Sequence, residues 1–328
     1  MSRAILVTGA TGNQGGAVIR ALLAQNANFQ ILAVTRNAAS VSAQKLAAKS
    51  PRITLVQGNL DDVDSLFRAA KQATKLPLWG VFSMQVQFIL CLRHHNFQAY
   101  SLLTFDPWQL PPFSKDGPTV EMRQGKALID ASITNGVGHF VYASVDRNGA
   151  QSDFNPTNVP HFRSKHYIEK HLLERSQTSA MSWTILRPAA FMENFDGGFI
   201  GKVTATSWKL VVKSRPLQLV AVDDIGWFVA NAFMEPGWSA GKCISLAGDE
   251  LTWEEAAKVF REATGKEIPM TWGFVARIIL WMSEPLGTMY AFFEKEGYGA
   301  DVEELKKVHP GLLSLKAWLE GKKAKKQQ

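Results

Sequence analysis

The sequence predicts an α/β fold, in which a doubly wound parallel sheet is followed by a smaller C-terminal substrate lobe. Three observations indicate this fold. Residues 4–23 read as strand, tight turn and helix, apolar strand-like runs alternate with helix-like segments as far as residue 188, and a looser Trp-, Gly- and Pro-rich pattern follows. Strands that alternate with helices in this way pair in parallel, with helices on both faces. We therefore expect a sheet domain over residues 1–190 and the lobe over residues 191–328.

The elements of the sheet domain follow from local periodicity. Short apolar runs predict strands at residues 4–7, 29–35, 53–57, 78–83, 139–144 and 182–188. Helical periodicity predicts helices at residues 17–23, 40–49, 63–73, 120–134 and 164–176. Asp61 or Asp62 is suited to cap the helix that begins at Val63. With 328 residues, of which 46% are apolar and 20% charged, the chain can bury a large core.

The C-terminal lobe contains four further signals. Val222 is followed by two acids that open a helix, where the helix dipole favours them. Residues 242–247 read as a strand that returns to the sheet, and Thr252 with Glu255 has the spacing of a capping box. Residues 274–293 are interrupted by Arg277, Glu284 and Pro285, which argues against a membrane span. We expect an amphipathic helix pair there, on the substrate side or at an interface.

The first turn carries three glycines, Gly9, Gly12 and Gly15, in the spacing Gly-x-x-Gly-x-x-Gly. Glycines at such a turn let the backbone approach a ligand, and the N–H groups of the new helix then face an anion, as in dinucleotide sites. A second strand follows at the distance that a βαβ unit needs. The turn therefore predicts a Rossmann-type domain that binds a dinucleotide, with a plain tight turn as the alternative.

The end of the second strand indicates which dinucleotide. An acidic residue there accepts a hydrogen bond from the ribose of NAD, whereas an arginine pairs with the 2′-phosphate of NADP. The chain has Thr35, Arg36 and Asn37 at this point and no Asp or Glu nearby. NADP(H) is therefore favoured, although an ordinary loop arginine would give the same pattern.

Ligands of a doubly wound sheet lie at the carboxyl ends of its strands. We therefore expect one crevice to collect the residues that follow these strands. They are the glycine turn, Arg36, Asn59, Ser83 to Gln85, Ser144 and Pro188 to Asn194.

Composition argues against several classes of protein. Cys91 and Cys243 are far apart and near no His-rich pattern, so we expect neither a disulfide framework nor a zinc site, and a reducing compartment. Part of the net charge of +7 lies in residues 322–326, and no basic helix interleaved with aromatics accompanies it, so we expect no direct nucleic-acid contact.

No signal segment precedes the first strand. We expect a cytoplasmic protein, with the nucleus as a second compartment, that is not bound to a membrane and is a monomer or homodimer.

Seven stretches carry a resemblance to a known family: residues 9–15, 34–37, 123–130, 140–144, 159–165, 186–195 and 222–225. Together they resemble the NmrA-like family, an NADP-binding branch of the atypical short-chain dehydrogenases/reductases, over nearly the whole chain. The resemblance implies NADP(H) contacts at Gly9, Ala10, Thr11, Gly12, Asn13, Gln14, Gly15, Arg36, Asn59, Leu60, Ser83, Met84, Gln85, Lys165, Phe191, Met192, Glu193 and Asn194.

The resemblance leaves two functions open. Short-chain dehydrogenases use Tyr-x-x-x-Lys, in which the lysine holds the nicotinamide ribose and assists the tyrosine as a proton donor. Lys165 has the lysine position, but the residue four before it is His161, an imidazole that can act as an acid there. We expect an oxidoreductase that acts on a small carbonyl or alcohol through Lys165 and His161. The alternative is a non-catalytic NADP(H) redox sensor that regulates a protein partner such as a transcription factor, because family members of that kind also carry His-Phe-x-x-Lys.

Residues 86–109 break the family pattern. The segment is apolar and aromatic, with only Arg93 and Asp106 charged, and joining Gln85 to Leu110 restores a sequence typical of the family. Its first codon must begin with GT, Leu-Thr within it can encode a CTNAC-like branch signal, and its last residue can be encoded by CAG. We expect an unspliced intron translated in frame, with a lineage-specific insertion as the alternative.

The same segment contains a histidine pair, His94 and His95. A metal site needs further ligands at helical or hairpin spacing, and no third ligand is present. We therefore predict no metal site.

Overall fold

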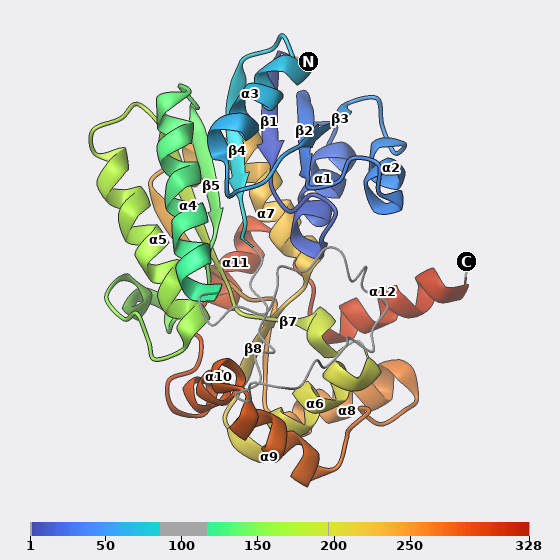
Figure 1. The fold of residues 1–328 in the computed structure, drawn as a ribbon. Coiled ribbons are helices and arrows are strands. Elements are labelled where there is room, and N and C mark those ends of the chain that lie inside the picture. The colour runs from blue at the N-terminus through green and yellow to red at the C-terminus, as the bar shows by residue number, and fades with distance from the viewer. Residues whose placement is uncertain (1, 86–116, 196, 328) are drawn as a thin grey trace.

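The computed structural model describes residues 2–85, 117–195 and 197–327 (Figure 1). A seven-stranded sheet has the order β3-β2-β1-β4-β5-β6-β9, and every neighbouring pair is parallel. The strands are β1 (Arg3–Val7), β2 (Phe29–Thr35), β3 (Ile53–Gln57), β4 (Leu78–Ser83), β5 (His139–Ala143), β6 (Ser182–Pro188) and β9 (Lys242–Leu246). The order reverses between β1 and β4, which is the switch point of a doubly wound sheet. The predicted fold class is therefore confirmed.

Helices cover both faces of this sheet. The helices are α1 (Asn13–Ala24), α2 (Val41–Ala47), α3 (Val63–Ala73), α4 (Gly117–Thr134), α5 (Pro160–Ser176), α7 (Val222–Met234) and α11 (Val302–Val308). Successive side chains of β1 point to opposite faces: Ile5 packs with α1, α7 and α11, whereas Leu6 packs with α3, α4 and α5. Both faces of β1 are thus fully buried, as in other parallel sheets.

The helix starts differ from the predicted ones at two places that matter for the site. The first helix begins at Asn13 rather than at residue 17, so the last of the three turn glycines lies inside it. The helix expected from residue 164 begins at Pro160, because proline is well suited to the first helical position, where no N–H is needed. His161 and Lys165 therefore lie one turn apart on the same helix.

A second, smaller layer lies below the first in Figure 1. Its sheet has the order β10-β8-β7, and its strands are β7 (Ala190–Phe191), β8 (Leu217–Val220) and β10 (Asp249–Leu251). Its helices are α6 (Gly198–Ser207), α8 (Trp253–Thr264), α9 (Gly273–Met282), α10 (Glu284–Lys295) and α12 (Leu315–Gln327). These elements enclose a core of their own around Trp208, Trp253 and Phe293. The expected helix pair at residues 274–293 is thus α9 and α10.

Several local signals predicted from the sequence are confirmed. β9 pairs in parallel with β6 and so returns to the large sheet. Thr252 and Glu255 form the capping box of α8, and Asp62 caps α3 by accepting from the Ser65 N–H at 3.0 Å.

None of the helices in the described part of the chain combines the length and apolarity that a membrane crossing needs. The expectations for residues 86–109 lie outside the described residues.

Candidate functional site

The glycine turn connects β1 to α1 at the carboxyl edge of the sheet. Gly9 has φ +60°, a conformation that favours glycine. A Cβ on Gly15 would lie 2.6 Å from the Gly9 carbonyl carbon, so the helix can approach the turn this closely only without a side chain. Gly12 is the N-cap of α1 and provides no capping side chain. The N-terminus of α1 is thus built from backbone alone, which suits an anionic ligand.

Thr8 holds the turn in register with the neighbouring strand. Its hydroxyl donates to the carbonyls of Phe82 and Met84, at 3.1 and 3.0 Å, and accepts from the Met84 N–H at 2.8 Å. The ends of β1 and β4 are therefore tied together where the strand order reverses. Gln85, next along the chain, donates to Ser83 Oγ at 3.0 Å, while its buried Oε1 has no partner among the described residues.

A cavity of about 390 Å³ opens beside the turn, between α1, α2 and the start of α7. Its lining residues are Ala10, Thr11, Gly12, Asn13, Gly16, Arg20, Ser42, Lys45, Leu46, Lys49, Glu193, Val222 and Asp223. Arg20 is paired with Asp223 at 2.6 Å. Lys45 and Lys49 bring two exposed amines to the opposite wall. The sequence did not lead us to either lysine. Their spacing of four residues, on a predicted helix directly after Arg36, places them on one helix face and could have identified them as phosphate-binding candidates.

The predicted contacts at the ends of β2 and β3 lie at the same edge of the sheet, because both strands run parallel to β1. Arg36 is exposed just beyond β2. Asn59 donates to Asp61 at 3.0 Å, and Asp61 accepts from Arg123 of α4 at 2.7 Å. This loop is therefore anchored to the first turns of α4. The hydrogen bonds that Asp61 accepts from Gln124, Asn59 and Arg123 lower its pKa.

The predicted contacts after β6 have different environments. Met192 is fully buried in the core of the smaller layer, Phe191 is half-buried on β7, and Asn194 is exposed. Glu193 lines the cavity, and its carboxylate accepts from the Val222 N–H at 3.1 Å and from Trp318 Nε1 at 3.2 Å. Burial raises the pKa of Glu193. This side chain thus joins the cavity wall to the starts of both α7 and α12.

The two candidate catalytic residues lie on α5. The Lys165 ammonium is 2.8 Å from the carboxylate of Glu121 on α4, and the lysine side chain is 14% exposed. His161 is buried, and its Nδ1 has no hydrogen-bond partner among the described residues. Burial, reinforced by the charge of Lys165, lowers the pKa of His161 to about 3. The imidazole is therefore neutral at pH 7.

Tyr142 of β5 lies beneath this pair. The Lys165 Nζ is 5.9 Å from the centre of its ring, and its buried hydroxyl has no partner among the described residues. Burial, reinforced by Glu121 and Glu169, raises the pKa of Tyr142 well above its ordinary value. Tyr142 is fully buried, so it is not a substitute for the tyrosine of Tyr-x-x-x-Lys.

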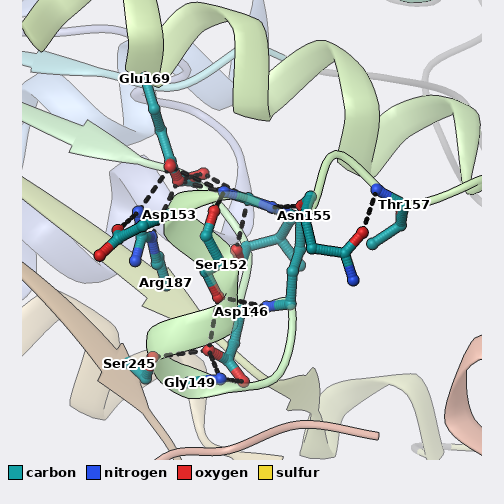
Figure 2. A network of polar contacts seen from close by, with 12 residues as sticks. Asp146, Gly149, Ser152, Asp153, Asn155, Thr157, Glu169, Arg187 and Ser245 are labelled. Carbon is teal, nitrogen blue, oxygen red and sulfur yellow. Dashed lines mark hydrogen bonds and ion pairs between the residues drawn. The ribbon is translucent and has the colours of Figure 1, made fainter. Parts of the chain in front are cut away.

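A buried polar network fixes the loop that leads into α5 (Figure 2). Glu169 accepts from Arg147 and from Arg187, each at 2.7 Å, and also from the Ser144 hydroxyl. Asp146 accepts from the N–H groups of Gly149 and Gly299 and from Ser152 and Ser245. Because the loop is held from both sides, the first two turns of α5, with His161 and Lys165, have a defined position. No sequence signal identified these partners.

Comparisons with known proteins identify relatives of this chain. The profile described as the NmrA-like family matches residues 1–90 and 111–319 and leaves residues 91–110 outside the match. The NmrA-like family domain-containing oxidoreductase cpsB of Aspergillus campestris is 29% identical over 282 residues, which are 80% of this chain and 74% of that protein.

Two solved structures have the same fold. The Citrobacter sp. triphenylmethane reductase complexed with NADP(H) has a TM-score of 0.67 and 18% identity, covering 98% of this chain and 99% of its own. NmrA, a negative transcriptional regulator in complex with NADP, has a TM-score of 0.59 and 17% identity, covering 97% of this chain and 94% of its own. At these identities the similarity establishes the fold alone.

Proposed function

Because this chain belongs to the NmrA-like family, we propose that it is an NADP(H)-dependent oxidoreductase that acts on a small organic carbonyl or alcohol. The observation that carries this proposal is the cavity of about 390 Å³ beside the glycine turn. It combines the bare N-terminus of α1 with two amines of the α2 segment, and both features favour phosphate groups. The oxidoreductase name of cpsB and the NADP(H) in the Citrobacter reductase support the same function.

The residues present fit the dinucleotide along the carboxyl edge of the sheet. The start of α1 would hold the pyrophosphate, and a Cβ at Gly15 would disrupt that approach. Arg36, exposed beyond β2, and Lys45, on the wall of the cavity, would attract the 2′-phosphate. Lys165, partly exposed at the start of α5, would donate to the ribose next to the nicotinamide. The bound cofactor would supply or accept a hydride.

The environment of His161 limits its part in the reaction. A neutral imidazole can accept a proton from an alcohol or donate a hydrogen bond to a carbonyl oxygen, but it is not a charged acid at pH 7. Lys165 carries ammonium protons and reaches solvent, so it is the better proton source for a reduced carbonyl in this proposal.

The second candidate is an NADP(H) redox sensor that regulates a protein partner. The burial of His161 favours it, because a buried side chain offers little access to a substrate. The shared fold with the regulator NmrA is compatible with this candidate.

One experiment separates these functions. Binding of NADPH and NADH is measured by isothermal titration calorimetry, and NADPH consumption is then followed at 340 nm against a broad panel of aldehydes, ketones and other carbonyl compounds. Turnover that is lost in Lys165→Ala supports the oxidoreductase. Tight binding of NADPH without turnover of any compound supports the sensor, and absence of binding contradicts both.

A further inference from the structure

Glu121 is a buried carboxylate at the start of α4 that sequence reasoning did not single out. Its side chain is 1% exposed. It accepts hydrogen bonds from two neighbours on α5: the Lys165 Nζ donates to one carboxylate oxygen at 2.8 Å, and the Ser164 hydroxyl donates to the other. The contact joins residues that are 44 positions apart in the chain.

The burial of this carboxylate has a physical consequence. An ionised carboxylate in the protein interior is unfavourable unless an opposite charge and hydrogen bonds compensate for it. Lys165 supplies the opposite charge, and the close packing of α4 against α5 holds the two groups together. Lys165 and Ser164 therefore compensate for the burial of the Glu121 carboxylate.

The geometry leaves the lysine only partly engaged. An ammonium has three N–H donors, and among the described residues the contact with Glu121 uses one of them. Lys165 is more exposed than its partner, at 14% against 1%, so Glu121 lies on its buried side. Within the described part of the chain, the other two donors are left for a ligand.

The other titratable groups around Lys165 do not replace Glu121. His161, one turn earlier on α5, is neutral at pH 7. Tyr142, from β5, presents its ring to the ammonium and keeps its hydroxyl proton. Glu169, further along α5, is occupied by Arg147 and Arg187.

We propose that Glu121 is a positioning residue of the cofactor site. It holds the Lys165 ammonium from its buried side and so directs the remaining N–H donors at the ribose hydroxyls next to the nicotinamide. This inference rests on the proposed binding of NADP(H), and it assigns to Glu121 a role that acts only through Lys165.

The test compares the NADPH dissociation constants of the full chain and of Glu121→Gln. Glutamine keeps the size and one acceptor oxygen but removes the charge that pairs with the lysine. The dissociation constant of Glu121→Gln should be roughly tenfold that of the wild type, which corresponds to the loss of a charge-assisted hydrogen bond.

Two further variants make the test specific. Asp130→Asn removes another carboxylate that links α4 to α5, through His171 and Arg175, and should behave as the wild type. In a Lys165→Met background, adding Glu121→Gln should change the dissociation constant by less than about twofold, because no ammonium remains to be positioned.

The outcomes distinguish the inference from the proposed function. If the wild type binds no NADPH, the proposed function fails. If the wild type binds NADPH and Glu121→Gln shows the same affinity, the inference fails and the proposed function stands. If Glu121→Gln does not fold, Glu121→Asp decides: it keeps the charge but withdraws it by one methylene, so affinity weakened several-fold supports positioning, and unchanged affinity overturns it.

Discussion

Arg147 and Glu169 form an ion pair in the protein interior, with Nη2 and Oε2 2.7 Å apart and the side chains 0% and 3% exposed. Arg187 shares the same carboxylate from β6, and the Ser144 hydroxyl completes its set of donors. One carboxylate on α5 thus joins that helix to β6 and to the loop that follows β5. Burial by itself raises the pKa of Glu169, but the two guanidinium groups hold it below its ordinary value.

Removing this carboxylate should destabilise the fold. We expect Glu169→Ala to lower the free energy of unfolding by about 3–5 kcal/mol, because two buried guanidinium groups lose their common partner. Urea unfolding followed by far-ultraviolet circular dichroism measures this change. As a control, Glu267→Gln breaks an exposed pair with Arg261 and should leave the midpoint unchanged. A loss below about 1 kcal/mol for Glu169→Ala would show that the network relaxes without cost.

The burial of His161 predicts a pH dependence of stability. Its pKa is about 3 in the folded protein and 6.5 for an ordinary histidine. Between these values the unfolded chain binds the proton and the folded protein does not, so stability present above pH 6.5 is lost as the pH falls towards 3. We expect His161→Leu to reduce the slope of unfolding free energy against pH by up to about 1.4 kcal/mol per pH unit between pH 4.5 and 6. Unchanged slopes in urea unfolding would contradict the buried, neutral imidazole.

Gly15 should tolerate no side chain. In Gly15→Ala the added methyl group meets the backbone of the turn, so α1 must move away from Gly9. We expect the affinity for NADPH, measured by calorimetry, to fall at least tenfold, because the helix N-terminus is displaced from the anion. Gly237→Ala is the matched control, since no atom of the described residues lies within 4 Å of a Cβ there. Equal affinities for the two variants would place the dinucleotide elsewhere.

Arg36 should determine the choice between the two dinucleotides. We expect the wild type to bind NADPH more tightly than NADH and Arg36→Asp to lose this preference, with NADPH affinity reduced roughly tenfold to a hundredfold. The physical reason is the loss of a charge-assisted contact to the 2′-phosphate. Lys71→Asp, an exposed charge reversal on α3, should leave the preference intact. The assignment is wrong if the unmutated protein binds both dinucleotides equally.

Deleting residues 86–109 should not harm the protein. The family profile leaves residues 91–110 outside its match, as expected for an insertion relative to the family, and we propose that residues 86–109 are an unspliced intron. We expect the deletion variant to show equal or better soluble expression and unchanged affinity for NADPH, since compact domains need only short connections. Sequenced transcripts should also lack about 72 nucleotides, at three per residue. Loss of folding on deletion, or retention of the stretch in every transcript, would favour a genuine insertion.

The sequence by itself determined the elements whose signals are local. Strand periodicity, the glycine turn and the capping box of Thr252 and Glu255 each depend on residues a few positions apart, and the structure contains all of them. The parallel order then follows, because strands separated by helices can pair only through crossover connections.

Only the tertiary structure decided which side chains share the site. Glu121 meets Lys165 across 44 positions, Arg187 meets Glu169 on a different element, and Lys45 lies on the wall of the same cavity as Gly12. Each of these relationships arises where two elements pack together after the chain has folded, and among them only Lys45, through its spacing with Lys49, left a signal in the sequence. For the same reason the sequence predicted the start of α5 at residue 164, which is four residues too far along the chain. The helix begins at Pro160, after a loop that the buried network of Asp146 and Glu169 holds in place.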